Sequence, residues 1–272
     1  MKLFNVLKAE FNIYRKSSIV KSLLIITFSF SILFGFMISH SSSFTGSLNF
    51  LALMKGYENG FNFSMSLTYS IYNILIFFVI LMASIAVSDE AQKGTLKTVL
   101  VKRVKRNDLI IGKFLFLLLF FFCLIAIISL FSLAIGGVLY GFPNISDKNY
   151  IIHSSLSLFF NYLLSLLLVV FPISALISLC LFFSVLFNNN ILPLISSLGV
   201  NFIFYIFAEL DFCKYLFLTD YLSFPLKTVQ KMAQGLPLIW IPGIEYMILA
   251  TLLYSAGFLV LAIIFFKRKE IP

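Results

Sequence analysis

Residues 109–139 have the sequence LIIGKFLFLLLFFFCLIAIISLFSLAIGGVL, in which Lys113 is the one charged side chain. As an ideal helix with a rise of about 1.5 Å per residue, this run would be about 46 Å long. The hydrocarbon layer of a membrane is about 30 Å thick. A run this long and this apolar is typical of a helix that crosses a bilayer while tilted or projecting beyond it. The stretch therefore predicts an all-α integral membrane protein.

The composition of the whole chain agrees with this prediction. Of its 272 residues, 61% are hydrophobic and 11% are charged, whereas soluble domains average about 45–50% apolar and about 25% charged. The longest stretches without a sustained apolar run are residues 39–68 and 209–243. Both are shorter than the roughly 40 residues below which domains seldom fold without disulfides or metals. We therefore expect no soluble domain, and any nucleotide hydrolysis would need another chain.

Six stretches are apolar enough, over about 20 residues, to be spanning helices. They are residues 19–38, 69–87, 109–139, 156–187, 191–208 and 244–266. The fourth run contains Pro172, which predicts a kink because proline has no backbone N–H to donate. An even number of spans predicts that both termini lie on the same side of the membrane.

The basic residues predict which side this is. Fifteen of the twenty Lys and Arg lie before or at the start of the first span, between the second and third spans or at the start of the third, or after the sixth. The predicted net charge is +10 on that side and −1 on the other. The positive-inside rule makes the basic side, with both termini, cytoplasmic. The excess of positive charge is thus explained by membrane topology and by contact with anionic lipids. We therefore expect no nucleic-acid partner.

No catalytic, metal or cofactor site is apparent in the sequence. The interiors of the spans hold no Asp, Glu, Lys or Arg, and Lys113 and Glu245 lie near span ends. Proton-coupled carriers, voltage sensors and intramembrane proteases usually carry such charges, so these classes are disfavoured. Gly112-Lys113 lacks the first glycine of a phosphate-binding loop, where Asn107 stands. Neutral polar residues in the spans either bond neighbouring helices or line a substrate path.

The N-terminal segment, residues 1–18, has the pattern of an amphipathic interfacial helix. Its apolar residues recur at helical spacing, and basic residues fall mostly elsewhere on the helix. Such a helix lies in the headgroup plane, with its basic face toward anionic lipid. The alternative is a basic leader that only fixes topology. The predicted apolar face consists of Leu3, Phe4, Leu7, Phe11 and Tyr14.

The loop of residues 88–113 joins the second and third predicted spans. Asp89 is placed to cap a helix, and Glu90 would lie in its first turn. Leu96, Val99 and Leu100 would form one apolar edge of that helix, with Gly94 in its interior. A short helix with one apolar edge is suited to docking on a soluble partner. From the residues alone, a basic loop of arbitrary sequence remains an equal alternative.

The same loop resembles a known family. Glu90, Gly94-Thr95-Leu96, Leu100, Arg106 and Gly112-Lys113 follow the pattern E-x-x-x-G-T-L…L…R…G-K. This pattern is similar to the first cytoplasmic loop of membrane subunits in the type-2 ABC exporter family, specifically its short branch. Members of that family often have a proline where this chain has Arg103.

The resemblance implies roles for three segments. The loop would be a coupling helix that docks on a separate ATPase, and close approach of the ATPase backbone would explain Gly94. Residues 1–18 would be the family's elbow helix, followed by a six-span domain over residues 19–272. Residues 209–243 would form an outer, re-entrant or interfacial segment. The docking residues carried over are Glu90, Gly94, Thr95 and Leu96, with Lys97 and Leu100 beside them.

The resemblance also implies a function. The chain would be the permease subunit of an exporter in a bacterial cell membrane, pairing with a second copy or a related chain. It would not itself be an enzyme, since the partner ATPase would bind ATP and Mg. The expected substrate is a toxin or antimicrobial peptide, or a hydrophobic drug. Two other classes remain open, namely a solitary ion channel or secondary transporter and a non-transporting scaffold that recruits a soluble partner.

Overall fold

The structure, a computed structural model, describes most of the chain outside residues 34–58. The described residues are 2–16, 21–22, 25–27, 29–30, 32–33, 59–94, 106–147, 150–208, 218–237, 240–241 and 243–269.

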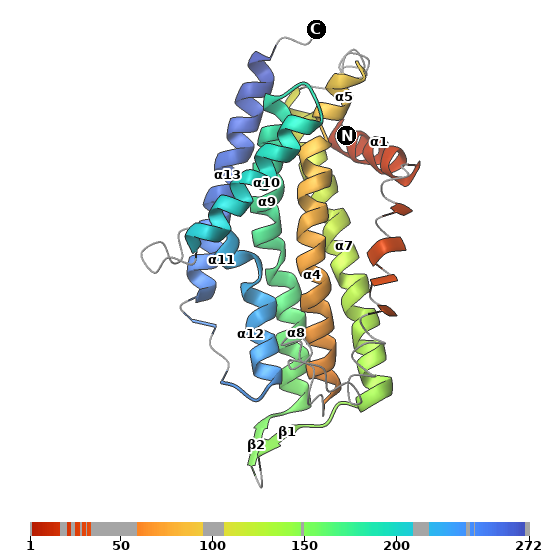
Figure 1. Cartoon of the computed structure of the whole chain (residues 1–272), viewed down its shortest axis with the longest axis vertical. Coiled ribbons are helices and arrows are strands. Elements are labelled where there is room, and N and C mark those ends of the chain that lie inside the picture. The colour runs from red at the N-terminus through yellow and green to blue at the C-terminus, as the bar shows by residue number, and fades with distance from the viewer. Residues whose placement is uncertain are drawn as a thin grey trace.

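The described residues form a bundle of long helices with shorter helices around it (Figure 1). The long helices are α4 (Gly60–Ile85), α7 (Arg106–Tyr140), α8 (Ser155–Leu168) with α9 (Val170–Leu186), and α13 (Gly243–Arg268). The shorter helices are α1 (Lys2–Lys16), α5 (Ser88–Gln92), α10 (Ile191–Ala208), α11 (Leu218–Leu222) and α12 (Phe224–Ala233). An antiparallel hairpin, which the sequence analysis did not predict, pairs β1 (Ile145–Asp147) with β2 (Tyr150–His153).

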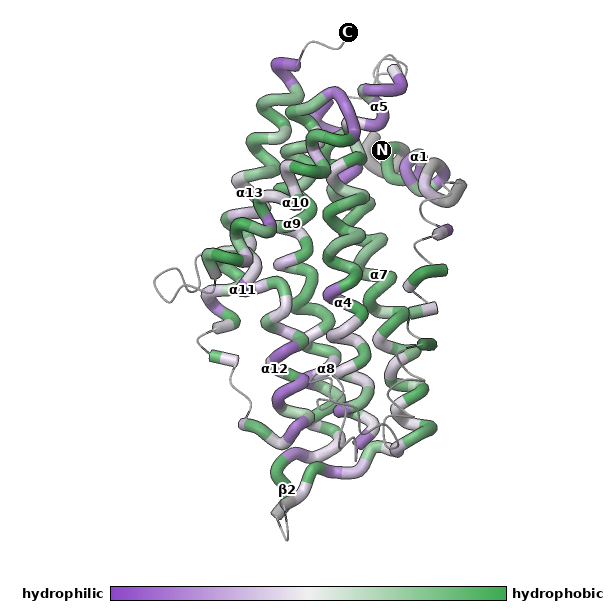
Figure 2. The backbone as a smooth tube through the Cα atoms, in the orientation of Figure 1, coloured by the Kyte–Doolittle hydropathy of each residue, from purple (hydrophilic) through white to green (hydrophobic). Residues whose placement is uncertain are grey.

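The bundle has two distinct ends (Figure 1). At one end lie α1, α5 and the last turn of α13, and at the other lies the hairpin. We call these the α5 end and the hairpin end. Helix α1 runs crosswise to the long helices, beside α7. Figure 2 shows the long helices as apolar over most of their length, with hydrophilic residues gathered at α5, on α12 and near the ends of the bundle.

Four helical stretches among the described residues are long and apolar enough to cross a membrane. They are Gly60–Gln92, Arg106–Tyr140, Ser155–Leu186 and Gly243–Arg268. The last three agree closely with predicted spans. The predicted fifth span, 191–208, forms α10, a shorter apolar helix. The predicted first span, 19–38, lies largely outside the described residues, so the structure does not establish six spans or their topology.

Helix α4 starts nine residues before the predicted span 69–87. The added residues include Ser64, Ser66 and Thr68, which interrupt the apolar run that the prediction followed. Their hydroxyls bond within the bundle. Ser64 Oγ donates to the backbone oxygens of Gly60, at 2.6 Å, and Ser132, at 2.9 Å. Asn59 caps the helix by accepting from the N–H of Phe61. Polar residues with satisfied partners therefore extend the helix.

Two glycines allow α4 and α7 to pack closely near the hairpin end. A Cβ atom on Gly60 would lie 2.5 Å from the backbone oxygen of Gly136, and a Cβ on Gly136 would lie equally close to the backbone oxygen of Gly60. Real Cβ atoms do not come this close to backbone, so each position requires glycine at the observed spacing. Contact of this kind is a common way to join helices in membranes, where small residues let backbones approach.

The kink expected at Pro172 stays a prediction, because Val169 keeps helical backbone angles and residues Ser155–Leu186 form one membrane-length helical stretch. The helix is interrupted at Val169, between α8 and α9. Pro172 has no N–H to donate to Leu168, four residues earlier, so one bond of the ladder is missing. The ladder resumes with the N–H of Ile173, which donates to the backbone oxygen of Val169 at 3.2 Å. Helix α9 beyond the break is the most buried part of the bundle, with every residue from Pro172 to Leu181 buried.

The described part of the predicted outer segment 209–243 packs against the bundle. Helix α12 contacts α4 and α8, and it buries Leu226, Val229 and Met232. Tyr72 Oη donates to the backbone oxygen of Leu222, at the end of α11, at 2.7 Å. These contacts hold α11 and α12 on the side of the long helices.

Candidate functional site

Helix α1 presents a mixed face to the bundle rather than a purely apolar one. Val6 and Glu10 are buried, and Leu7 and Tyr14 pack against the core. The ring of Tyr14 stacks on that of Phe116, with centroids 4.8 Å apart. Phe11, by contrast, is 57% exposed, so it does not share the buried face with Leu7 and Tyr14. The side chains of the other two predicted residues, Leu3 and Phe4, lie outside the described residues.

Gly112 lets α1 lie directly against α7. A Cβ atom at this position would lie 2.5 Å from Cγ1 of Val6, so a larger residue would push the two helices apart. The helical spacing of Val6 and Glu10 places them one turn apart on α1. Lys113 follows Gly112 directly. The close contact at Gly112 thus brings Glu10 beside Lys113.

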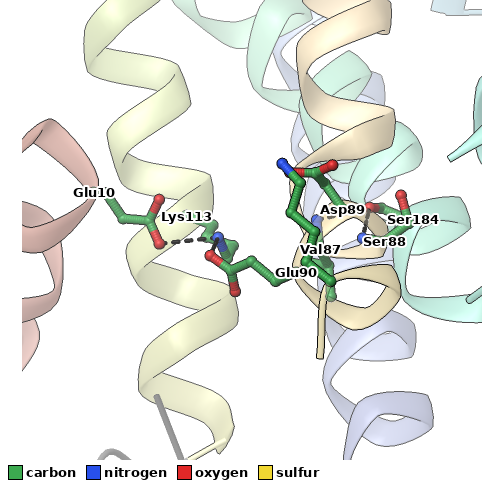
Figure 3. Close-up of polar contacts among 8 residues, drawn as sticks. Glu10, Val87, Ser88, Asp89, Glu90, Lys113 and Ser184 are labelled. Atoms are coloured by element: carbon green, nitrogen blue, oxygen red, sulfur yellow. Dashed lines mark hydrogen bonds and ion pairs between the residues drawn. The ribbon is translucent and has the colours of Figure 1, made fainter. Parts of the chain in front are cut away.

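Lys113 is the centre of a buried ion cluster formed by Glu10, Glu90 and Lys113 (Figure 3). Its side chain is only 2% exposed. Nζ lies 2.9 Å from Oε1 of Glu10, on α1, and 2.7 Å from Oε1 of Glu90, on α5. The cluster therefore joins three helices that are far apart in the sequence. A buried lysine is stable in such a place only when it is paired.

The cluster carries one more carboxylate than it has cations. Burial raises the pKa of Glu10 above its ordinary value of 4.5, Lys113 opposes this increase, and the nearby carboxylate of Glu90 adds to it. The second oxygen of Glu10, Oε2, is buried and has no hydrogen-bond partner. Burial likewise raises the pKa of Tyr14 to about 12, so this neighbour stays neutral at physiological pH.

Helix α5 is fixed at its start by a side chain from α9. Ser184 Oγ accepts from the backbone N–H groups of Val87, at 2.9 Å, and Ser88, at 3.1 Å. The predicted cap, Asp89, is therefore wrong, since the helix begins at Ser88 and Asp89 lies within its first turn. Asp89 instead accepts from Nδ2 of Asn190, which follows α9, at 2.8 Å. Sequence reasoning missed this cap because it comes from a residue about a hundred positions away.

Gly94 ends this helix rather than lying inside it. Helix α5 stops at Gln92, and Gly94 has a φ of 68°, in the left-handed region that glycine adopts without strain. The expectation that Gly94 lies in a helix interior is therefore wrong. No atom lies within 4 Å of where its Cβ would be, so the space beside it is open. The other predicted docking residues, Thr95, Leu96, Lys97 and Leu100, lie outside the described residues.

The second end of the loop is fixed to α13. Arg106 Nη1 donates to the backbone oxygens of Phe266, Lys267 and Lys269, at 3.0, 3.0 and 2.9 Å. It thereby satisfies carbonyls that the end of a helix leaves without partners. Lys269 in turn donates from Nζ to the backbone oxygens of Val185 and Phe187, at the end of α9. These bonds tie the ends of α7, α13 and α9 together.

The motif residues at the two ends of the loop thus have contacts that explain their positions. Glu90 pairs with Lys113, Gly112 admits α1, and Arg106 caps α13. Sequence reasoning missed Glu10 altogether. Two features of the sequence pointed to it: Glu10 is acidic on a helix expected to be apolar and basic, and Lys113 is the one charged residue of the predicted span 109–139. Neither feature says that the two residues meet.

Among the described residues, no three His, Cys, Asp or Glu side chains are grouped so as to hold a metal ion. The site is instead a loop held at both ends between helices long and apolar enough to cross a membrane, which is the architecture of a helical membrane protein. Residues 6–208 match a family model described as "ABC-2 family transporter protein", and the chain belongs to that family. It is a membrane permease component of an ABC-2 type transporter, and this permease family lacks the nucleotide-binding ATPase domain. None of the curated proteins matches the chain.

Proposed function

We propose that this permease exports an amphipathic substrate from the cell and is driven by a separate ATPase that docks on the loop of residues 88–113. ABC-2 permeases generally pair with an ATPase subunit. The observation that carries the proposal is the attachment of this loop. Its first end is bonded to α1, α7 and α9, and its second end to α13. A force applied to such a loop reaches four helices at once.

The ATPase would contact Glu90, Gly94, Thr95 and Leu96, with Lys97 and Leu100 beside them. ATP and Mg would bind in the ATPase and not in this chain. Closure of two ATPase subunits would displace the loops, and the bundle would move between two packed states, as rigid helices do in rocking transitions. The side chain of Glu90 is 16% exposed, with its Oε2 atom buried, and the exposed turn of Gln92, Lys93 and Gly94 follows it directly, which gives a partner a surface next to Glu90.

The proposed orientation puts the α5 end in the cytoplasm, with six spans in the complete bundle. The basic residues of the loop and the exposed Phe11 on α1 suit a surface of anionic lipid headgroups. The segment 209–243 would lie on the outer side and dip back into the membrane. A second permease, as a copy or a related chain, would complete the substrate path. Helix α13 leaves a long apolar face for lipid or for that second subunit, since little of it is buried in this chain.

The proposed substrate class is a toxin or antimicrobial peptide, or a hydrophobic drug. The resemblance to the short exporter branch supports this class. So does the chemistry of the spans, whose interiors offer apolar groups and neutral polar groups but no Asp, Glu, Lys or Arg. Lys113, near a span end, is already paired. Such a lining suits cargo that is itself partly apolar.

The test is co-expression with an ATPase encoded beside this chain, purification through the permease alone, and an assay of ATP turnover in lipid. We expect the ATPase to copurify. Gly94→Leu should leave insertion intact and abolish substrate-stimulated turnover. The matched control is Gly141→Leu, at the hairpin end, since Gly141 also has a positive φ, 66°, and open space beside it. It should keep turnover.

Each other outcome favours a different class. An ATPase that copurifies but has the same turnover with and without the permease would favour a scaffold. A permease that conducts or transports with no ATPase bound would favour a solitary channel or secondary transporter. Wild-type turnover in Gly94→Leu would contradict the docking assignment.

A further inference from the structure

The buried ion cluster has two carboxylates for one lysine, and the two differ in how firmly they are held. Glu10 lies in the middle of a 15-residue helix whose neighbouring side chains are packed on the bundle, and its side chain is 6% exposed. Glu90 lies on a five-residue helix that ends at a left-handed glycine, and its side chain is 16% exposed. Figure 3 shows the two carboxylates reaching Lys113 from opposite sides. The start of α5 is bonded to Ser184, and Glu90 Oε2 is buried as Glu10 Oε2 is. Of the two side chains, that of Glu90 is therefore the more exposed, and it is the one we take as able to leave.

A second carboxylate changes what happens when the first one moves. If Glu90 were the sole partner, its departure would leave an unpaired ammonium group in a site that is 98% shielded, a strongly unfavourable state. With Glu10 in place, Lys113 keeps a partner at 2.9 Å throughout. The surplus negative charge also weakens the hold on each carboxylate, because the two repel each other.

We propose that Glu10 is the standing counterion of Lys113, which frees Glu90 to exchange between Lys113 and the docked ATPase. This inference rests on the proposed function, and it assigns Glu10 as a positioning residue that acts on the docking loop through Lys113. The amphipathic helix α1 is then part of the coupling machinery and not only a membrane anchor. The alternative is that the cluster only holds the three helices together. In that case every ion pair would be needed, and the second carboxylate would give no advantage, so the two alternatives predict different effects of substitutions at Glu10 and Lys113.

The experiment follows the distance between α1 and α5 in the complex of permease and ATPase in lipid. Spin labels are placed at Lys8→Cys and Gln92→Cys, two exposed positions on these helices, in a background whose native cysteines are replaced by alanine. The label-to-label distance is measured by pulsed electron resonance without nucleotide and with a non-hydrolysable ATP analogue. ATP turnover is measured on the same unlabelled variants. The wild type should show a nucleotide-dependent change in this distance.

Three variants test the role of Glu10. Glu10→Gln should keep the distance at its nucleotide-free value and lower ATP turnover about tenfold, a typical size for coupling between sites. Glu10→Asp, which keeps the charge, should retain most of both. The double variant Glu10→Gln with Lys113→Gln removes the cation that would otherwise hold Glu90. It should regain the distance change and exceed the turnover of Glu10→Gln alone.

The opposite results would overturn the inference. If the double variant is worse than Glu10→Gln alone, the cluster only holds the three helices together. If Glu10→Gln shows the same nucleotide-dependent distance change and the same ATP turnover as the wild type, Glu10 has no part in coupling. If the wild type binds the ATPase and the distance does not respond to nucleotide, Glu90 does not exchange, while the docking proposal survives. A wild-type chain that captures no ATPase removes the docking proposal itself.

Discussion

The two ends of the bundle are held together by different chemistry. At the α5 end, ionic groups bridge segments that are distant in sequence, as in the cluster of Glu10, Glu90 and Lys113. At the hairpin end, the bridges between described residues are neutral. Thr68 and Tyr162 share a hydrogen bond of 2.8 Å, and Asn59 Nδ2 donates to the backbone oxygen of Pro143 at 2.9 Å. There, close glycine contact between α4 and α7 adds to these bonds.

The difference shows what each end can do. Neutral hydroxyl bonds and glycine contacts depend on short, fixed distances, so the hairpin end is a permanent joint. An ion cluster with a surplus carboxylate can lose one bond and stay compensated, so the α5 end can change partners. Charged groups are also tolerated better near water than in the hydrocarbon interior. In the proposed mechanism, the exchange of Glu90 is the movement at the α5 end, while the bonds from Ser184 hold the start of α5 in place.

The largest expected effect comes from removing the cation at the α5 end. Lys113→Met should lower the free energy of unfolding by about 3–5 kcal/mol, because it leaves two buried carboxylates without a cation. Thermal unfolding of the purified permease in lipid discs would measure this. The matched control is Lys267→Met, an exposed lysine at the same end. Adding Glu10→Gln and Glu90→Gln to Lys113→Met should restore most of the loss, and failure to do so would mean that packing of the lysine stem matters more than its charge.

The next largest effect tests the permanent joint at the hairpin end. Gly136→Ala should destabilise the fold by about 1–3 kcal/mol, since a methyl group there collides with Ser64 Oγ and the backbone of Gly60. Gly199→Ala, on α10, is the control, because no atom lies within 4 Å of its added methyl group. It should be neutral or stabilising, as alanine favours helix over glycine. Equal results for both variants would argue against close contact of α4 with α7.

A smaller effect depends on pH at the α5 end. The pKa of Glu10 is raised in the folded protein, so the folded state binds this proton more tightly than the unfolded state. The stability of the wild type relative to Glu10→Gln should therefore be greatest in acid and fall as pH rises above 4.5 through the raised pKa. Unfolding of both proteins over a series of pH values isolates this group. A relative stability that rises with pH in that range would show that Lys113 outweighs burial.

The smallest effect separates buried from exposed charge at the same end. Lys93 pairs with Asp89 at 2.6 Å, but its side chain is 65% exposed. Lys93→Met should change the free energy of unfolding by about 0.5 kcal/mol or less, since water screens such pairs. The measurement is the same thermal unfolding in lipid discs. A loss as large as that of Lys113→Met would mean that burial does not set the strength of the ion pairs here.

Much of the fold follows from apolar runs. Residues 109–139, 156–187 and 244–266 predicted long helical stretches to within three residues at each end, and Pro172 lies three residues after the interruption at Val169. The start of α4 was missed because its serines and threonines satisfy their hydroxyls on neighbouring backbone. Hydropathy averages over side chains and carries no information about such partners.

The candidate site was less predictable than the fold. The sequence placed Glu90 and Gly94 in one loop but did not indicate that Glu90 faces Lys113 or that Gly94 ends a helix. The cap from Ser184 and the ion pair from Glu10 are long-range contacts, and a single sequence contains no direct record of them. The residues that make up the loop could therefore be predicted from the sequence, but the contacts that they make with distant segments could not.

Because Arg106 bonds to the end of α13, the second end of the loop can be fixed only late in the synthesis of the chain. Arg106 leaves the ribosome some 160 residues before its first partner, Phe266. At about 5–20 residues per second, the wait is on the order of 10–30 s. During this time the second end of the loop cannot bond to α13, even if the earlier helices have already packed together. The loop is therefore complete only after α13 has been made, and under the proposed function an incomplete permease would offer the ATPase an unfinished docking surface.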